Sequence, residues 1–332
     1  MRSADSPIVI ATRGSALALA QTNCVLAQCR TAFPAMQCVV KIVKTTGDRL
    51  QTLSLDNPNQ QVTKGLFTKE LEVALLENEA DLAVHSLKDL PTELPAGLIL
   101  GAVSRRADAR DLLIYRDAEF STQSLEGRGL ARGFAANSTI HAFPSGATIA
   151  TSSTRRHAQL LALRPDLKVV PIRGNVGTRL QKLAENAEID ALVLAVAGIE
   201  RLHFSVSPTG ALHGEGVPPG LLAVYLSTDE MLPCVGQGAL GLEIRAGDAR
   251  AAHLCEGLND ISTFHCVTAE RAFLHAMGGG CLSPVAAYAE MLGGQLHVRA
   301  LSFRGEKLQR AEIRGAVQDA VSLGKELAAR FG

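Results

Sequence analysis

The sequence lacks an excess of charge of either sign and any long hydrophobic run. Its 332 residues include 33 Lys and Arg and 33 Asp and Glu, so the formal net charge is zero with His neutral. Such a chain has no general electrostatic attraction to nucleic acid or membrane surfaces, so any recognition of anions must be local. No apolar run approaches the roughly 18 residues that a membrane helix needs. We therefore expect neither nucleic acid nor membrane as a partner.

Signals for secretion, disulfides and metals are missing as well. Met1–Ile10 lacks a basic segment followed by an apolar core, so we expect no secretory signal. The seven cysteines include no C-x-x-C pair, which argues against a disulfide framework or zinc site. None of the nine histidines belongs to an H-E-x-x-H pattern. These absences predict a cytoplasmic protein without a bound metal.

What is present is an alternation of strand and helix signals, typical of a largely parallel α/β sheet. Strands are expected over Ile8–Thr12, Val39–Thr45 and Leu82–His85, with Ser15 as the N-cap of an Ala- and Leu-rich helix and a second helix over Gly65–Glu79.

A second unit echoes the first. Ile149–Thr154 is similar to Ile10–Ser15, and Asp190–Val196 is similar to Asp81–His85. Two such units would leave a cleft between them, where ligands usually bind. From about Gly247 the pattern changes to a small α+β domain, with a helix over Ser262–Met277, strands over Val285–Met291, Leu296–Phe303 and near Leu308–Ile313, and a closing helix from Val317.

Two stretches have irregular composition. Thr46–Thr63 is rich in Asn, Gln, Asp and Ser, the composition of a mobile lid. Residues 119–146 form a long insertion containing Ser, Gly and Ala, which is either partly helical or disordered.

Basic residues gather where strands end. Arg13 and the pair Arg155–Arg156 lie at equivalent strand-to-helix turns, Arg173 and Arg179 flank a third, and Lys88 and Arg201 follow strands. Helix N-termini and Arg side chains both bind carboxylates, so several such turns around one cleft indicate a ligand with several anionic groups. Carboxylate is favoured over phosphate, because the chain has no Walker motif and no G-x-G-x-x-G fingerprint. For any single arginine, a solvated surface position is the alternative.

Two further residues are candidates for chemistry. Asp89 follows a strand and precedes Pro91, so it either caps a turn or acts as a carboxylate in a cleft of arginines. Cys281 follows Gly278-Gly279-Gly280, which lets a bulky group approach its thiol. His85 is interpreted as a core residue at the end of a strand.

Together these motifs resemble the hydroxymethylbilane synthase (porphobilinogen deaminase) family. The similar segments run in order over nearly the whole chain: Ile10–Gln21, Lys64–Glu72, Val84–Pro91, Thr151–Arg156, Arg173–Leu180, Leu194–Gly198, Val235–Ala239 and Gly279–Cys281.

The resemblance implies two lobes like those of type II periplasmic binding proteins plus the small α+β domain. The implied boundaries are 1–105 with a return segment at about 225–245, then 106–224, then 246–332. It also implies a dipyrromethane cofactor joined by a thioether to Cys281, and head-to-tail condensation of four porphobilinogens with loss of ammonia, by a monomer.

The resemblance also assigns roles to residues. Asp89 is the catalytic carboxylate. The remaining roles are binding of cofactor carboxylates by Lys88, Ser153, Arg155 and Arg156, binding of substrate carboxylates by Arg13, Ser15, Arg173, Arg179 and Arg201, and a lid and cleft border at Lys64 and Phe67.

The sequence departs from the family pattern in two places. Leu282-Ser283-Pro284 follows Cys281 where many relatives have glutamine and valine before the proline, and the 119–146 segment is longer than expected. Two alternatives stay open: a non-catalytic binding protein with the same lobes, and a family member that binds without turnover.

Overall fold

The computed structural model describes residues 6–48, 67–123, 132–279, 284–305 and 308–332. Its first sheet has the strand order β2-β1-β3-β12-β4. The first three of these strands run parallel, and β12 runs antiparallel to both β3 and β4. The bounds are β1 (Ile8–Arg13), β2 (Cys38–Val43), β3 (Leu82–Ser86), β4 (Leu98–Val103) and β12 (Leu240–Arg245).

Helices cover both faces of this sheet. α1 (Ala16–Ala32) and α8 (Ala249–Leu258) pack on one face, and α3 (Lys69–Leu76) packs on the other. The predicted boundary at 246 is therefore wrong: Ala251, Leu254, Cys255 and Leu258 recur at helical spacing and are buried in the core of the first lobe.

The second sheet repeats the first. Its order is β7-β6-β8-β5-β11, again three parallel strands followed by a strand that is antiparallel to both of its neighbours. Its elements are β5 (Asp111–Arg116), β6 (Thr148–Ala150), β7 (Lys168–Val170), β8 (Ala191–Ala195), β11 (Leu221–Leu226), α5 (Thr154–Leu163), α6 (Val176–Glu185) and α7 (Val196–Arg201), with a short hairpin of β9 (Ser205–Val206) and β10 (Leu212–His213).

Matching side chains support this equivalence of the lobes. Asp81 accepts a hydrogen bond of 2.8 Å from Val9 N at the start of β1, and Asp190 accepts one of 2.8 Å from Thr148 N at the start of β6. Ser15 caps α1 and Ser153 caps α5. The predicted echo is thus present in the structure, although the cap of the second lobe lies one residue earlier than the sequence alignment placed it.

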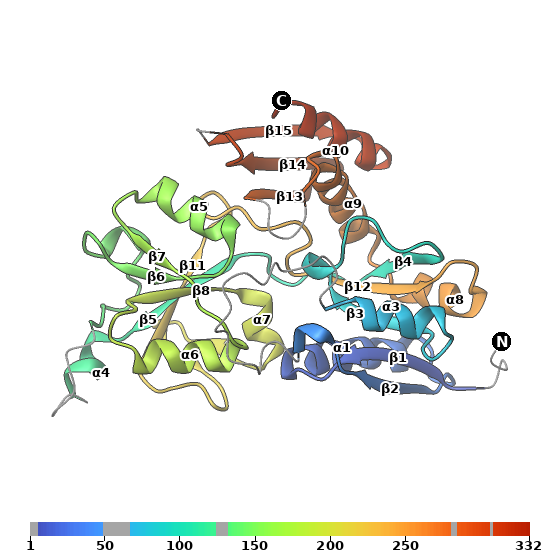
Figure 1. Ribbon diagram of the computed structural model, residues 1–332, viewed down its shortest axis with the longest axis horizontal. Coiled ribbons are helices and arrows are strands. Elements are labelled where there is room, and N and C mark those ends of the chain that lie inside the picture. The colour runs from blue at the N-terminus through green and yellow to red at the C-terminus, as the bar shows by residue number, and fades with distance from the viewer. Residues whose placement is uncertain (1–5, 49–66, 124–131, 280–283, 306–307) are drawn as a thin grey trace.

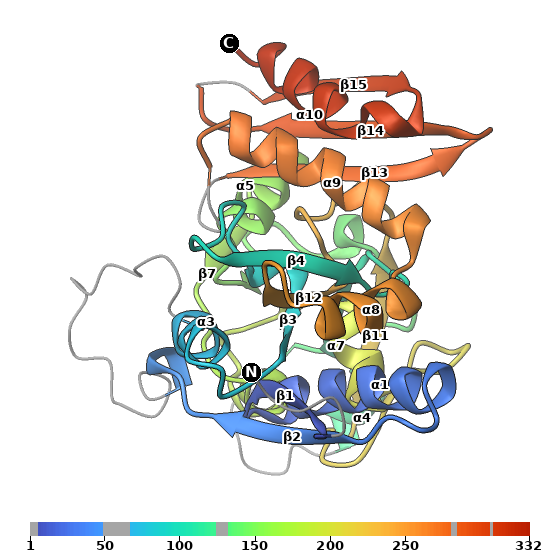
Figure 2. The ribbon, with the colours of Figure 1, turned by 90° about the vertical axis from the view of Figure 1, so that its right-hand side faces the viewer.

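The third domain is an antiparallel sheet of β13 (Val285–Leu292), β14 (Gln295–Ser302) and β15 (Gln309–Gly315). Two helices, α9 (Ile261–Ala276) and α10 (Ala320–Ala329), pack on one face, and η3 (Val317–Asp319) leads into α10. Figure 1 shows the two lobes side by side with this domain above them, and Figure 2 shows α9 running beside its sheet. The predicted fold class is confirmed.

Two crossing segments connect the lobes: residues 104–110 between β4 and β5, and residues 227–239 between β11 and β12. A backbone hydrogen bond from Ala107 N to Gly238 O (3.1 Å) joins them, and Ser104 N donates to Leu240 O at the start of β12 (3.0 Å). Arg106 ties both to the third domain, since its guanidinium lies 2.5 Å from Glu270 of α9.

Two sequence expectations concern loops. The described part of the 119–146 insertion begins with α4 (Ala118–Gln123) and includes η2 (Ile140–Ala142), and Ile140 and Phe143 are buried in the core of the second lobe. Most of the expected lid lies outside the described residues. Among the described residues, the helix predicted over Gly65–Glu79 spans Lys69–Leu76.

Candidate active site

The end of the second crossing segment, Val235–Ala239, is the centre of the candidate site. Gly236 and Gly238 have φ values of +73° and +87°, which disfavour any other residue. A Cβ on Gly238 would lie 2.5 Å from the carbonyl oxygen of Ala107. The two glycines therefore allow the crossing segments and the neighbouring turn to approach closely.

The turn that carries Lys88 and Asp89 packs against this segment. It is the short 3-10 helix η1 (Leu87–Asp89) at the end of β3. Leu87 N donates to Ala239 O at 3.0 Å, and a Cβ on Gly236 would lie 3.2 Å from Lys88 N. Asp89 is exposed and Lys88 half-buried, so the turn presents a carboxylate at the surface beside the crossing segment.

Arg155 and Arg156 converge on a buried carboxylate that sequence reasoning missed. Their Nη2 atoms each lie 2.7 Å from an oxygen of Asp111, whose side chain is fully buried. Burial alone would raise the pKa of Asp111, but the charges of Arg155 and Arg156 hold it well below its usual range. The Nε atoms of both arginines are buried without a hydrogen-bond partner among the described residues.

Gln237 links this group to the crossing segment. Its side-chain Nε2 donates to Asp111 Oδ1 at 2.8 Å and to Ala109 O at 2.7 Å. Its backbone carbonyl oxygen accepts from Arg106 Nε at 2.8 Å. The paired arginines of the second lobe are thereby connected to the junction of all three domains.

Arg179 and Arg201 complete the basic group. Burial lowers the pKa of Arg179, and the neighbouring charge of Arg156 lowers it further. Burial also lowers the pKa of Arg201, whose Nη2 donates to Gly238 O at 2.6 Å. Neither guanidinium forms an ion pair with an acidic side chain among the described residues. Both are therefore partly desolvated cations for which an anion would be a favourable neighbour.

The structure gives Arg13 a different setting. Its guanidinium stacks 4.1 Å from the centre of the Phe67 ring and lies 2.5 Å from Asp48. Burial alone would raise the pKa of Asp48, but hydrogen bonds from Arg13 and Thr45 lower it below its usual range. Arg13 is thus balanced by a carboxylate of its own lobe, which local sequence could not reveal because 35 residues separate the pair.

The remaining predicted residues are dispersed or outside the description. The Ser15 side chain accepts from Ala18 N at 3.3 Å as the cap of α1, and Arg173 is exposed. Cys281 and Lys64 lie outside the described residues. No group of three metal-ligating side chains, and no helix long and apolar enough to cross a membrane, occurs in the parts of the chain that the structure describes.

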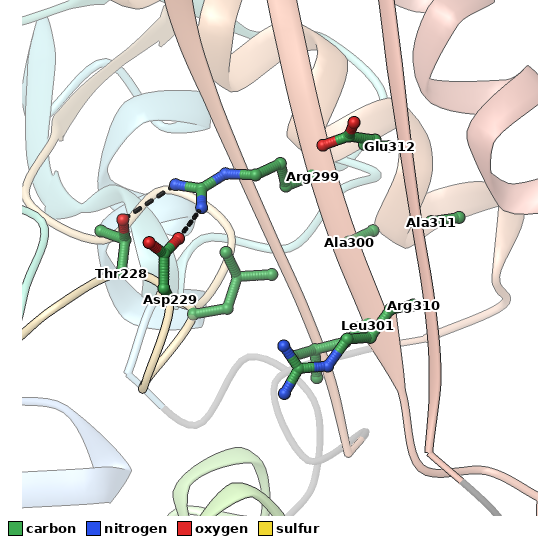
Figure 3. Close-up of a pocket in the computed structure, with 9 residues that line it drawn as sticks. Thr228, Asp229, Arg299, Ala300, Leu301, Arg310, Ala311 and Glu312 are labelled. Carbon is green, nitrogen blue, oxygen red and sulfur yellow. Dashed lines mark hydrogen bonds and ion pairs between the residues drawn. The ribbon is translucent and has the colours of Figure 1, made fainter.

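A cavity of about 380 Å³ lies elsewhere, between residues 228–232 and the strands β14 and β15. Figure 3 shows Arg299 reaching Asp229 and Thr228 across one side of it. None of the predicted site residues lines this cavity.

The two lobes share one strand order and are joined by two crossing segments, with basic turns beside these segments. The chain is therefore a two-lobed α/β protein with an appended α+β domain. Residues 8–253 match the family model "Porphobilinogen deaminase, dipyromethane cofactor binding domain", and residues 264–332 match "Porphobilinogen deaminase, C-terminal domain". The chain belongs to the porphobilinogen deaminase family.

Curated relatives agree over nearly the full length. The porphobilinogen deaminase of Syntrophus aciditrophicus is 43% identical over 97% of this chain and 94% of its own. Those of Desulforudis audaxviator and Thermus thermophilus are 42% and 41% identical, over 98% and 97% of this chain and 94% of each relative. Among solved structures, an extracellular-binding protein of a probable amino-acid ABC transporter from Bacillus subtilis aligns with a TM-score of 0.36 and 10% identity, over 76% of this chain and 90% of its own.

Proposed function

We propose that this protein is a hydroxymethylbilane synthase, a transferase of tetrapyrrole and heme biosynthesis. It joins four porphobilinogens head to tail with loss of ammonia, and water releases the linear product hydroxymethylbilane. Each pyrrole of the substrate carries an acetate and a propionate, so the growing chain accumulates carboxylates.

One observation of the candidate site supports the proposal most strongly. Arg179 and Arg201 are partly desolvated guanidiniums without an acidic partner among the described residues, and burial lowers the pKa of each. A carboxylate ligand removes that cost and forms the bidentate bonds for which Arg is suited. We assign substrate carboxylates to these two residues together with Arg13, Ser15 and Arg173.

The residues present fit a dipyrromethane with several carboxylates. Arg155 and Arg156 have buried Nε donors without hydrogen-bond partners among the residues that the structure describes, and Asp111 fixes the orientation of both side chains. We assign them, with Lys88 and Ser153, to the cofactor carboxylates, and its thioether to Cys281. When bound, the cofactor supplies the pyrrole carbon to which the first substrate is joined.

Asp89 is the proposed catalytic carboxylate. It sits exposed at the end of η1, where it can exchange a proton with the leaving amine and stabilise the cation left on the substrate. Phe67, stacked on Arg13, and Lys64 are assigned to the border of the lid and cleft.

The proposal includes a monomeric, cytoplasmic enzyme with no nucleic acid or membrane partner. It also keeps the division into two lobes and a third domain, with the first lobe extended to include α8. The competing function, ligand binding without turnover, is separated from it by one assay.

That assay incubates the purified protein with porphobilinogen and follows substrate loss and hydroxymethylbilane formation. Asp89→Asn should lower kcat about 10²- to 10⁴-fold, the usual contribution of a general acid or base. Asp319→Asn is the matched control, since Asp319 is also an exposed last residue of a 3-10 helix. Normal turnover in Asp89→Asn would remove the catalytic assignment, and no turnover by the unaltered protein would favour the binding protein.

A further inference from the structure

A buried imidazole–carboxylate pair lies directly before the proposed catalytic turn. His85 is the fourth residue of β3, and its Nε2 lies 2.9 Å from Oε2 of Glu243 on β12. The His85 side chain is 4% exposed and that of Glu243 is 0% exposed. The predicted interpretation of His85 as a core residue is correct about its burial but overlooks its partner.

A second carboxyl group lies close to the pair. Glu72 of α3 is buried over β3 and β12, and its charge interacts with both Glu243 and His85. Burial raises the pKa of Glu72, and the negative charge of Glu243 adds to the rise. Glu72 Oε1 and Glu243 Oε1 are buried without a hydrogen-bond partner among the described residues. The first lobe therefore holds a costly polar cluster inside its core.

The second lobe shows that the fold does not need this cluster. In the first lobe Leu82 pairs with Ile10 on β1, and in the second Ala191 pairs with Ile149 on β6. Counting three residues along from each makes Leu194 the equivalent of His85.

The same register identifies the equivalent of Glu243. Glu243 pairs with Ala83, the residue after Leu82, and Ile114 pairs with Leu192, the residue after Ala191. Leu194 and Ile114 are 5% and 0% exposed and lie in one apolar cluster. The second lobe thus has Leu194 and Ile114 at the positions where the first lobe has His85 and Glu243.

A buried imidazole–carboxylate pair is weak evidence for stability, because apolar residues of similar volume are often as stabilising or more so. Unlike a contact between Leu and Ile, a hydrogen bond is directional, so the pair can hold one strand against the other at a defined register. Here the two strands are β3, which ends in the Lys88–Asp89 turn, and β12, which begins directly after the crossing segment.

The turn already depends on that segment. Leu87 N donates to Ala239 O at 3.0 Å, just beyond the pair. Any slippage between β3 and β12 would move the turn relative to Gly236–Gly238, which also contacts Arg201.

We propose that His85 and Glu243 are positioning residues that hold the Lys88–Asp89 turn in register with the crossing segment. They do not contact the reacting atoms; they fix the place of Asp89 relative to the arginines of the second lobe. The inference rests on the proposed function, since only that function makes Asp89 catalytic.

The test installs the residues of the second lobe in the first. The double variant His85→Leu/Glu243→Ile should keep the fold and an unchanged or higher thermal unfolding midpoint. Its kcat per cofactor-loaded molecule, counted by intact mass, should fall about 10- to 100-fold, the effect expected of a small misplacement of catalytic groups, with a smaller change in KM. Hydrogen exchange at the Leu87 amide should become faster.

Control variants separate positioning from general damage. His297→Leu removes another imidazole–carboxylate pair, with Nε2 3.0 Å from Glu312 in the third domain, and should leave kcat unchanged. Glu243→Met removes the hydrogen-bond acceptor at nearly the same side-chain length. If the double variant does not fold, this single variant decides, with lower kcat and faster Leu87 exchange as the expected result.

Unchanged kcat and unchanged Leu87 exchange in the folded double variant, or in Glu243→Met where only that folds, would overturn the inference. If the unaltered protein turns over porphobilinogen in the same assay, this failure leaves the proposed function standing. If the unaltered protein does not, the proposed function fails first, and the exchange measurement still decides whether the pair holds the turn.

Discussion

Neutralising Asp111 should strongly destabilise the second lobe. Asp111 accepts hydrogen bonds from Arg155 Nη2 and Arg156 Nη2 at 2.7 Å each and from Gln237 Nε2 at 2.8 Å. Asp111→Asn preserves the shape, so it creates no cavity, but it leaves two buried guanidiniums without a counter-charge. Breaking a buried pair by removing one partner costs about 3–5 kcal/mol.

The assay is thermal unfolding with a matched control. At roughly 2–4 °C per kcal/mol for a domain of about 150–250 residues, the midpoint should fall by about 6–20 °C. Asp108→Asn breaks a solvent-facing pair with Arg110, 42% exposed, and should cost about 0–1 kcal/mol. A shift for Asp111→Asn no larger than the control's would refute the reasoning.

The pH dependence of Asp111 has a defined sign. Its pKa is depressed in the folded protein, so its stabilisation is present above the unfolded value of 3.8 and is lost as the pH falls through the folded value. The difference between the unaltered protein and Asp111→Asn should therefore shrink only in strong acid. A difference that disappears near neutral pH would contradict this assignment of the carboxylate.

Two further changes have predictable outcomes. Glu72→Gln should stabilise the protein by about 1–3 kcal/mol at neutral and alkaline pH, because ionising this carboxyl in the core is unfavourable. The gain should fade as the pH drops toward the ordinary pKa of 4.5. Chemical denaturation at several pH values measures it, and a gain that grows in acid would contradict the prediction. Gly238→Ala should cost about 1–3 kcal/mol of stability, because φ is +87° and the new Cβ would lie 2.5 Å from the carbonyl oxygen of Ala107. A thermal midpoint equal to that of the unaltered protein would contradict this prediction.

Much of the fold could be predicted from local sequence. The strands that periodicity predicted lie within about two residues of the observed ones, whereas β4, β5, β7, β11 and β12 were not predicted. The Ser15 cap, the repeat of Asp81 at Asp190 and the three-strand third domain are present. These features are encoded by neighbouring residues. The position of α8 was missed because its apolar face fits either domain until the packing is known.

The partners of the site residues could not be predicted in the same way. Asp111 is 44 residues from Arg155, and Glu243 is 158 residues from His85. Nothing in the local pattern around an aspartate that begins a strand indicates which cation it meets. Sequence therefore predicted which cations belong to the site, while the structure was needed to show which of them pair with a carboxylate and which have no acidic partner among the described residues.

The most direct test of the account is the intact mass of the purified protein. We expect a mass above that of the 35.1 kDa sequence by two linked pyrrole units, and no excess in Cys281→Ser. The measurement is repeated after incubation with porphobilinogen, so that a preparation lacking the cofactor can acquire it. An unmodified mass even then, or an excess that persists in Cys281→Ser, would contradict the covalent anchor and with it the proposed chemistry.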